Sequence, residues 1–199
     1  MLRSPNTATK VLATAVVVGL IGAVAGVGTW SAFSGTTSND GNSFAAGSVT
    51  LSDNDSGSAM LSLSGAKPGD SDTSCIEVTY TGSLASAVRL YGATTGTGLD
   101  QYLSLTVTRG TTTSAFDSCT GFTADSTDYN GSGAGVVYSG TLAAFPDTYA
   151  AGVVDPNSTA PESWSTNEKH AYKFVVTVQD NDAAQGKNAT QQFTWEARS

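Results

Sequence analysis

The sequence has little charge and few of the residue types that metal sites and nucleophilic catalysis use most. Charged residues make up 13% of 199 positions, with 1 His and 2 Cys, against roughly a quarter charged residues in ordinary soluble domains. HExxH, GxSxG and CxxC motifs are absent, as is a second imidazole for a zinc site or a Ser-His-Asp relay. We therefore expect no enzyme activity, no metal site and no cofactor. Hydrolysis by paired carboxylates stays open, because Asp and Glu are plentiful.

Basic side chains are also scarce. The chain has 9 Lys and Arg against 17 Asp and Glu, which gives a formal charge of -8 and a pI near 4.3. A protein that binds a phosphate backbone needs basic side chains to neutralise it. The charge balance therefore argues against a nucleic-acid partner.

The residues that are abundant favour strands and turns. Ser and Thr together number 53 and Gly 22, whereas Glu, Lys, Arg and Leu are scarce. Apolar and polar residues alternate with the period of a half-buried strand most clearly in 103–108, 172–179 and 192–198. Weaker strand candidates are 45–51, 60–63, 75–80, 87–91 and 136–141. About eight strands are predicted.

Only residues 141–152 could form a short helix, and Pro146 weakens that prediction. Strands joined by turns, without crossover helices, are typical of antiparallel architectures. We therefore predict an all-β fold, an antiparallel β-sandwich of jelly-roll type with at most one or two short helices.

The N-terminus is typical of a secretory signal peptide. Arg3 and Lys10 are the only charges before Asp40, and an uncharged stretch, 11–28, follows them. Small side chains then occupy the positions expected for cleavage between Ser31 and Ala32. The prediction is a cleaved segment, 1–31, and a secreted protein without a stable membrane span. A retained anchor is the alternative, since the apolar stretch would only just cross a bilayer of about 30 Å.

Cleavage would leave 7 basic and 17 acidic residues, so the formal charge would become -10. A secreted chain enters an oxidising compartment, where two cysteines are expected to pair. Cys75 and Cys119 are therefore predicted to form a disulfide, and two free buried thiols are the alternative.

Two remaining features are candidate ligand sites. His170 opens the predicted strand 172–179 and is expected to be a solvated strand-end residue. The turn 53–57 superficially resembles a calcium loop, but its glycine comes one place early and the twelfth position is Ser64 instead of Glu. A plain turn is expected. Calcium at the acidic turns remains an alternative without further support in the sequence.

Several motifs occur in one order along the chain. They are Gly28–Phe33 (GTWSAF), Ser43–Ser52 (SFAAGSVTLS), Lys67–Asp70 (KPGD), Gly82–Ala85 (GSLA) and Phe193–Ala197 (FTWEA). With these motifs the chain resembles the TasA/camelysin family of secreted bacterial surface proteins. The resemblance covers the first 85 residues well and the last 30 or so moderately. Between about 90 and 165 only the general character matches.

The resemblance implies a jelly-roll subunit that a dedicated signal peptidase releases and that polymerises into extracellular biofilm-matrix fibres. In that family's fibres, the N-terminal segment of one subunit lies as a strand in the sheet of the next. Carried over here, the donor strand is 32–44, from Ala32 and Phe33 to Phe44, ahead of a jelly-roll domain at 45–199. No apolar residue lies between Phe33 and Phe44, so main-chain hydrogen bonds would have to hold the strand. A flexible arm on a monomeric protein is the alternative.

The sequence thus predicts a secreted, non-enzymatic structural subunit whose main partner is itself, with other matrix or surface proteins as further partners. Some members of the family carry a metallo-endopeptidase label, so a cell-surface protease is one alternative. A monomeric surface adhesin is another, for which Trp164 and Trp195 could offer stacking surfaces. Trp195 is expected in the core, because it lies on the apolar face of the last strand.

Overall fold

The computed structural model describes residues 34–38, 49–111 and 115–199. The predicted signal peptide lies outside the described residues, and so do Ser31, Ala32, Phe33 and Phe44. No helix in the described part of the chain is both long and apolar enough to cross a bilayer.

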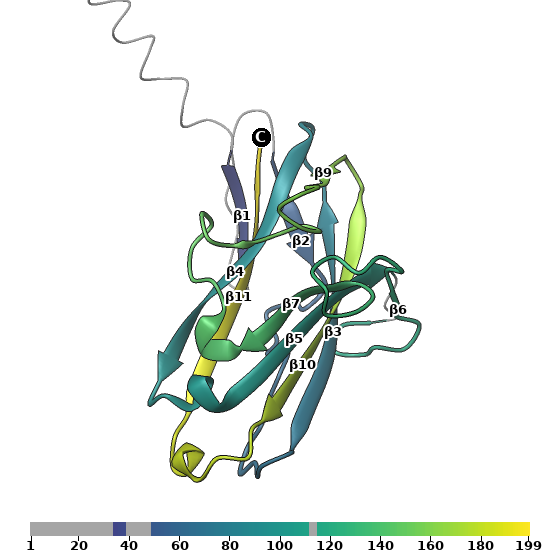
Figure 1. Ribbon diagram of the computed structural model, residues 1–199. Coiled ribbons are helices and arrows are strands. Elements are labelled where there is room, and N and C mark those ends of the chain that lie inside the picture. Colours follow the sequence, from purple (N-terminus) through teal and green to yellow (C-terminus); the bar gives the residue numbers. More distant parts are fainter. Residues whose placement is uncertain (1–33, 39–48, 112–114) are drawn as a thin grey trace, which may run out of the picture.

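The described chain forms two antiparallel sheets packed face to face (Figure 1). In the first sheet, β1 pairs with β11, β11 with β4, and both β8 and β9 pair with the other edge of β4. In the second sheet, the order is β2, β3, β10 and β5, and both β6 and β7 pair with β5. The strands of the first sheet are β1 (Ser34–Ser38), β4 (Ser86–Gly96), β8 (Val153–Val154), β9 (Ser163–Trp164) and β11 (Ala189–Arg198). Those of the second are β2 (Leu51–Asp53), β3 (Ser71–Tyr80), β5 (Leu103–Thr111), β6 (Thr123–Ala124), β7 (Val136–Thr141) and β10 (Lys169–Val178).

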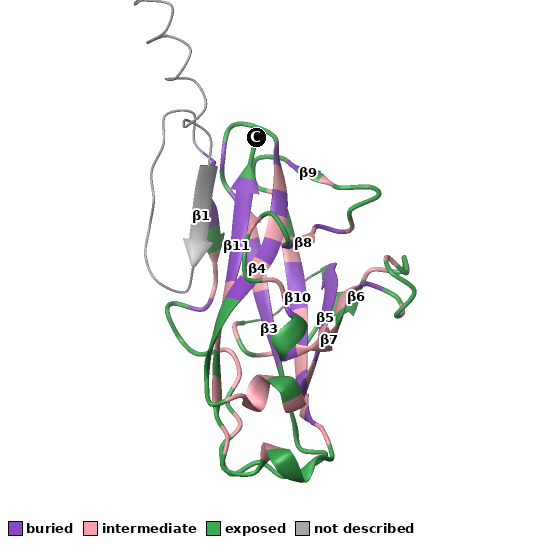
Figure 2. Ribbon diagram, turned by 60° about the vertical axis from the view of Figure 1, so that its left-hand side comes forward, coloured by how far each residue is buried: buried purple, intermediate pink, exposed green. Residues whose placement is uncertain are grey.

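The core fills the space between the two sheets, where the buried stretches of the strands face each other (Figure 2). Along β10, Tyr172, Phe174, Val176 and Val178 are all buried, and the residues between them are only partly buried. Every second residue of a strand points to the same face. The period-two pattern of the sequence therefore becomes the inner face of this strand.

The two ends of the sandwich carry different connections. The β3–β4 connection and the last residues of β11 lie at the upper end of Figure 1. The β4–β5 and β10–β11 connections lie at the lower end, with the 3-10 helices η1 (Leu99–Tyr102) and η3 (Asp182–Ala184). The ten residues of β3 run from one end to the other, and at a rise of about 3.3 Å per residue they span roughly 30 Å.

The predicted all-β class and antiparallel pairing are confirmed, but eleven strands form in the described residues in place of about eight. The strand predicted at 60–63 is wrong. Met60, Leu61 and Leu63 lie in a loop and pack against the core from outside the ladder. The strand predicted at 45–51 meets β2 only at Leu51, and 45–48 lie outside the described residues.

The sequence predicted at most one or two short helices, with 141–152 as the candidate, and both the number and this length differ from the structure. Three 3-10 helices of three or four residues occur in the described chain, and within 141–152 only η2 (Leu142–Ala144) forms. Phe145, which precedes Pro146, is extended at φ -65° and ψ 135°. A residue before proline is driven out of the helical region, because the proline ring clashes with its backbone.

Cys75 and Cys119 form a disulfide with a Cα–Cα distance of 5.1 Å. It ties the segment after β5 to the fully buried Cys75 of β3. The amide of Asp117 also donates to the carbonyl of Cys75 at 3.0 Å. The two cysteines are 44 positions apart, and closing a loop of that length stabilises a fold by about 4 kcal/mol in the chain-entropy model.

Candidate functional site

The outer edge of the first sheet contains the described part of the predicted donor segment. β1 pairs with β11 in antiparallel register, from Ser34 opposite Arg198 to Ser38 opposite Thr194. β1 thus covers the upper half of this edge of β11. In the described part of the chain, no strand covers the same edge at the lower half, Ala189–Phe193. A strand edge with unpaired N–H and C=O groups is a template for another strand.

The outer face of β11 beside β1 is held by a ring of polar contacts. Glu196 is 5% exposed and accepts hydrogen bonds from the Tyr91 hydroxyl at 2.7 Å and from Nε of Arg198 at 2.6 Å. Burial and this bond to Glu196 raise the pKa of Tyr91 to about 12. The guanidinium groups of Arg198 and Arg89 lie 3.8 Å and 5.0 Å from the ring centre of Tyr149. These cation–π contacts hold the two guanidinium groups against Tyr149 at the upper half of β11.

A second site, a buried ion cluster, lies between the two sheets near their upper end. Arg109 of β5 is 5% exposed. Its Nη1 donates to Oδ2 of Asp125 at 2.6 Å, and its Nη2 donates to Glu162. Its Nε lies 3.1 Å from Oδ1 of Asp155 as an ion pair, without the alignment of a hydrogen bond. One guanidinium thus faces three carboxylates.

Asp155 is the most enclosed member of this cluster. Its Oδ1 accepts from the Tyr172 hydroxyl at 2.8 Å and its Oδ2 from the indole N–H of Trp164 at 2.9 Å. Asp155 directly follows β8 and Trp164 lies in β9, and both strands pair with β4 in the first sheet. Arg109 and Tyr172 belong to the second sheet. The cluster therefore joins one sheet to the other.

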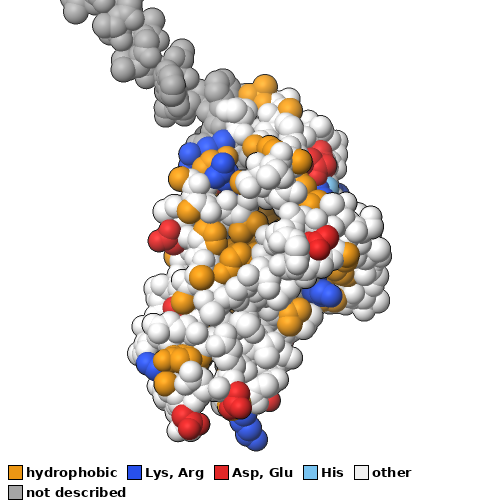
Figure 3. Space-filling model, in the orientation of Figure 1, with side chains coloured by type: hydrophobic (Ala, Val, Ile, Leu, Met, Phe, Trp, Pro, Cys, Tyr) orange, Lys and Arg blue, Asp and Glu red, His pale blue; other side chains and the backbone are white. Residues whose placement is uncertain are grey.

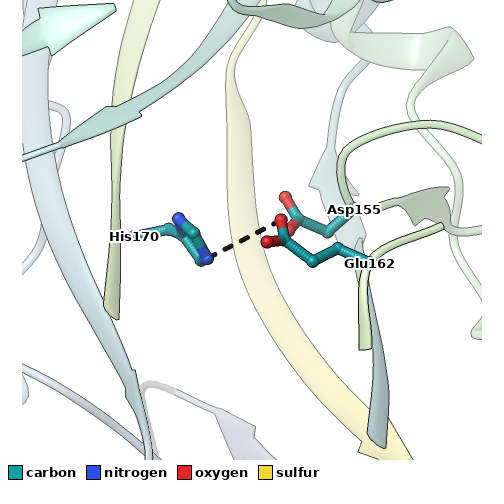
Figure 4. A group of neighbouring side chains, drawn as sticks. All are labelled: Asp155, Glu162 and His170. Carbon is teal, nitrogen blue, oxygen red and sulfur yellow. Dashed lines mark ion pairs between the residues drawn. The ribbon is translucent and has the colours of Figure 1, made fainter. Parts of the chain in front are cut away.

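His170 completes the cluster from β10 and points toward the two carboxylates of Asp155 and Glu162 (Figure 4). Its Nε2 lies 2.9 Å from Nη2 of Arg109, 3.1 Å from Oε1 of Glu168 and 3.9 Å from Oε2 of Glu162. The prediction of a solvated strand-end histidine is wrong, because the side chain is only 12% exposed and its ring packs 4.5 Å from that of Trp164.

Burial and ion pairing shift the pKa values of the cluster in opposite directions. Burial raises the pKa of Asp155 and Glu162, and the nearby Arg109 only partly offsets this rise. Burial alone would lower the pKa of Arg109, but Asp155 and the other acidic groups raise it above its ordinary value. Glu168 shifts the other way: burial would raise its pKa, but hydrogen bonds from the Ser165 amide and from His170 lower it.

The same residues form the one group of three or more possible metal ligands in the described chain. Ligand atoms of Asp155, Glu162 and His170 all lie within 4.8 Å of one another. Both oxygens of Asp155 already accept hydrogen bonds, and Glu162 accepts from Arg109. A cation bound there would have to displace this guanidinium. The geometry is that of a structural ion cluster.

A sequence signal for the cluster existed but was missed. Arg109 continues the inward positions Leu103, Leu105 and Val107, and His170 continues the inward positions of β10. A charged or titratable residue at an inward position of a strand must be paired when buried. Nothing in the sequence, however, indicated that Asp155 and Glu162 are its partners.

Both tryptophans of the described chain are buried, and the acidic turn 53–57 is an ordinary turn. Trp195 is 3% exposed, which confirms its core position, but Trp164 is fully buried and offers no stacking surface. The turn 53–57 is a plain turn in which Oδ1 of Asp55 accepts from the Gly57 amide at 2.6 Å. In the described residues it does not belong to a group of three possible metal ligands.

In the described residues, fold and site together define a two-sheet, antiparallel all-β protein in which β1 pairs with the upper half of β11 and a buried ion cluster lies between the sheets. No protein-family model and no curated protein matches the chain. The resemblance to the TasA/camelysin family therefore stays a prediction from its motifs.

Proposed function

We propose that the protein is a secreted structural subunit of jelly-roll type that polymerises into extracellular or biofilm-matrix fibres by donating its N-terminal strand to a neighbouring subunit. The observation that carries the proposal is the pairing of β1 with β11. The family resemblance implies 32–44 as the donor segment. Five of its residues form β1 and run along an edge of the first sheet. The same edge of a second copy would accept the same strand.

The composition of β1 supports an exchangeable strand. It reads Ser-Gly-Thr-Thr-Ser, with no charge and no large apolar side chain. A strand of this kind depends mainly on main-chain hydrogen bonds, which any copy of the chain can supply equally well. When one copy donates to the next, the contact is head to tail and does not close on itself, so it extends into a filament.

Electron microscopy of two proteins tests the proposal. The first begins at Ala32, the predicted mature N-terminus, and the second begins at Ala45 and so lacks the donor segment. Filaments are expected from the first protein only, provided that circular dichroism shows both to be folded. Filaments from both proteins, or from neither, would contradict strand donation.

One observation favours a second function, a cell-surface metallo-endopeptidase. It is the group formed by Asp155, Glu162 and His170. This function requires zinc to displace Arg109 from the cluster. Stoichiometric zinc in the purified protein, together with cleavage of casein that a chelator abolishes, would establish it in place of the structural role. Loss of both on substituting His170→Ala would assign the metal to this site.

A further inference from the structure

The lower half of β11, Ala189–Phe193, has a free edge that opens onto a space between the sheets. This space has a volume of about 1010 Å³, and its lining includes all five of these consecutive residues together with the loop 57–68. Successive side chains of a strand point to opposite faces, so a run of consecutive lining residues indicates that the edge of the strand meets the space. In the described part of the chain, this edge has no partner strand.

The pairing of β11 with β4 shows which main-chain groups lie at the free edge. Gly92 lies opposite Phe193, but its amide donates to the carbonyl of Pro146 instead of to β11. Gly92 and Phe193 are therefore a non-hydrogen-bonded pair, in which the N–H and C=O groups point away from the partner strand. The same alternation directs the N–H and C=O groups of Gln191 and Ala189 to the free edge. An added strand would find a ladder of hydrogen-bonding groups there.

The register of β1 indicates which segment matches this edge. Ser38, the last residue of β1, lies opposite Thr194. An antiparallel strand that continues in this register places residue 39 opposite Phe193 and residue 43 opposite Ala189. Residues 39–43 lie outside the described residues. They match the free edge residue for residue.

The sequence of 39–43 suits these positions. Residues directly opposite each other share one face of a sheet. Asp40, the only charge in the segment, falls opposite Gln192, which is exposed on the outer face. Asn39, Gly41 and Ser43 fall on the inner face, and none of them has a large side chain. A strand of this sequence therefore keeps its charge in solvent and brings only small groups into the space between the sheets.

A chain cannot place this segment on its own free edge. Val49 precedes β2, which pairs with the last residues of β3 at the upper end of the sandwich. Ala189 begins β11 at the lower end, roughly 30 Å away along the strands. The chain from residue 43 to Val49 reaches at most about 22 Å when fully extended. From Ser38 to Val49 it reaches about 36–40 Å, so one chain can pair its own β1 with the upper half of β11.

We infer that the donor strand in the fibre continues past Ser38, and that residues 39–43 of one subunit pair with Ala189–Phe193 of the next. This inference rests on the proposed fibre function and specifies how far the donor strand extends. A strand from a second copy does not have to return to the upper end of the acceptor. The short connection 44–48 therefore makes the complete ladder possible only between copies, in a head-to-tail contact that extends into a filament.

This contact does not depend on attraction between charges. The chain has a formal charge of -8, so two copies repel each other at long range. Main-chain hydrogen bonds of an added strand do not depend on the charge of the side chains. Charged side chains are sparse on the face in Figure 3, where most of the surface is uncharged. A ladder is thus a contact that this chain can form with its own kind.

Cross-linking at the far end of the ladder tests the inference. Ser43→Cys protein is mixed with Ala189→Cys protein under mild oxidation, each starting at Ala32 and bearing its own mass tag. Mixed disulfide dimers are expected at least about tenfold faster than in a control mixture of Ser43→Cys with Thr190→Cys, because the side chain of Thr190 points to the opposite face. Equal rates would overturn the extension. A double variant, Ser43→Cys with Ala189→Cys, that closes its disulfide within one chain would also overturn it.

Lengthening the connection tests the argument from chain length. About eight Gly and Ser residues inserted after Gly47 extend the reach to roughly 46–50 Å, so that a chain can pair 39–43 with its own β11. Self-pairing has the advantage of a high effective concentration, and the protein concentration needed for filaments should rise at least about tenfold. The same insertion after Gly131, in an exposed turn, should leave this concentration unchanged. Equal concentrations for the two insertions would overturn the inference.

The cross-links also separate the extension from strand donation. Mixed dimers of Ser38→Cys with Thr194→Cys, without mixed dimers of Ser43→Cys with Ala189→Cys, would overturn the extension and leave strand donation intact. Mixed dimers at the second pair without filaments would support the pairing and contradict the fibre function. If neither pair forms mixed dimers and no filaments appear, both the fibre function and the extension fail.

Discussion

Buried charge is the residue-scale feature that most distinguishes this sandwich. Arg109 and Asp155 are each 5% exposed and face each other across the space between the sheets. A buried ion pair adds little stability relative to apolar residues of the same shape, but removing one partner leaves an uncompensated charge. The cluster is therefore better suited to specifying how the two sheets are aligned than to adding net stability.

The substitution Asp155→Asn is expected to lower the free energy of unfolding by about 3–5 kcal/mol. The amide has one accepting oxygen where the carboxylate has two, so it cannot accept from both the Tyr172 hydroxyl and the Trp164 indole. It also leaves Arg109 with one carboxylate fewer. Urea denaturation at pH 7 measures the loss. The matched control is Asp147→Asn, an exposed position, where a change of about 0.5 kcal/mol or less is expected. Equal losses for the two variants would show that the cluster has no structural role.

The two glutamates at the cluster should give stability profiles of opposite slope. The folded pKa of Glu162 is raised, so its ionisation opposes folding, and the unmodified protein should gain stability relative to Glu162→Gln as pH falls through that raised pKa. The folded pKa of Glu168 is lowered, so its ionised form stabilises the fold above the unfolded value near 4.3. Stability relative to Glu168→Gln should therefore be lost as pH falls through the lowered pKa.

Melting temperatures of the three proteins between pH 7 and pH 3 test this pair of slopes. Both glutamine variants keep the size of the side chain, so each serves as the packing control for the other. Parallel curves for the two variants would contradict the assigned environments.

At the scale of single elements, β4 and β11 approach closely enough to exclude a side chain. A Cβ placed on Gly92 would lie 2.0 Å from the carbonyl oxygen of Gln192 in the backbone of β11. The Gly92 amide also donates to the carbonyl of Pro146 at 2.8 Å, where the segment after η2 meets the sheet. Gly92 therefore allows β4, β11 and the segment after η2 to lie in direct contact.

The substitution Gly92→Ala should therefore destabilise the protein by about 1–3 kcal/mol, because the strand backbone has to move to accommodate the methyl group. The neighbouring Ala93→Gly, which removes a Cβ from an exposed position of the same strand, should cost only about 0.5–1 kcal/mol. Thermal unfolding followed by circular dichroism gives both values. If Gly92→Ala costs no more than Ala93→Gly, β4 and β11 do not approach this closely at Gly92.

The disulfide is the second element-scale constraint, since it fixes the segment after β5 to β3. Replacing both cysteines, Cys75→Ala with Cys119→Ala, should reduce the free energy of unfolding by about 4 kcal/mol. Reduction of the unmodified protein should produce a similar loss in the same urea titration. If the oxidised and reduced proteins unfold at the same urea concentration, the pairing contributes nothing to the folded state.

A strand can be predicted from the sequence where it buries one face along its length, because its apolar residues then alternate with polar ones. The long strands β3, β4, β5, β10 and β11 were predicted because each buries one face and so alternates. Met60–Leu63 alternates too, but it is a loop that packs against the core without pairing in a ladder. The two-residue strands β8 and β9 follow neither a pattern nor a composition of their own, because β4 provides the edge that defines them. The ion cluster escaped prediction for the same reason, since its members come from β5, the segment after β6, the β8–β9 connection and β10.

At the scale of the whole molecule, a low charge occurs together with a sheet edge that is only partly paired in the described residues. Charged residues make up 13% of the chain, and β1 has none. Along the lower half of β11, one edge has no partner strand among the described residues. In the proposed fibre function, the net negative charge is expected to keep free subunits in solution until a strand is donated.

The central claim is that the strand on β11 comes from a neighbouring subunit in the fibre, and site-directed cross-linking tests it most directly. Ser38 faces Thr194 across β1 and β11, so Ser38→Cys protein is mixed with Thr194→Cys protein, each starting at Ala32 and bearing its own mass tag. The account predicts that mixed disulfide dimers accumulate as filaments form. The contrary result is a double variant that closes its disulfide within one chain while the mixture yields no mixed dimer, because the strand would then belong to a self-contained monomer.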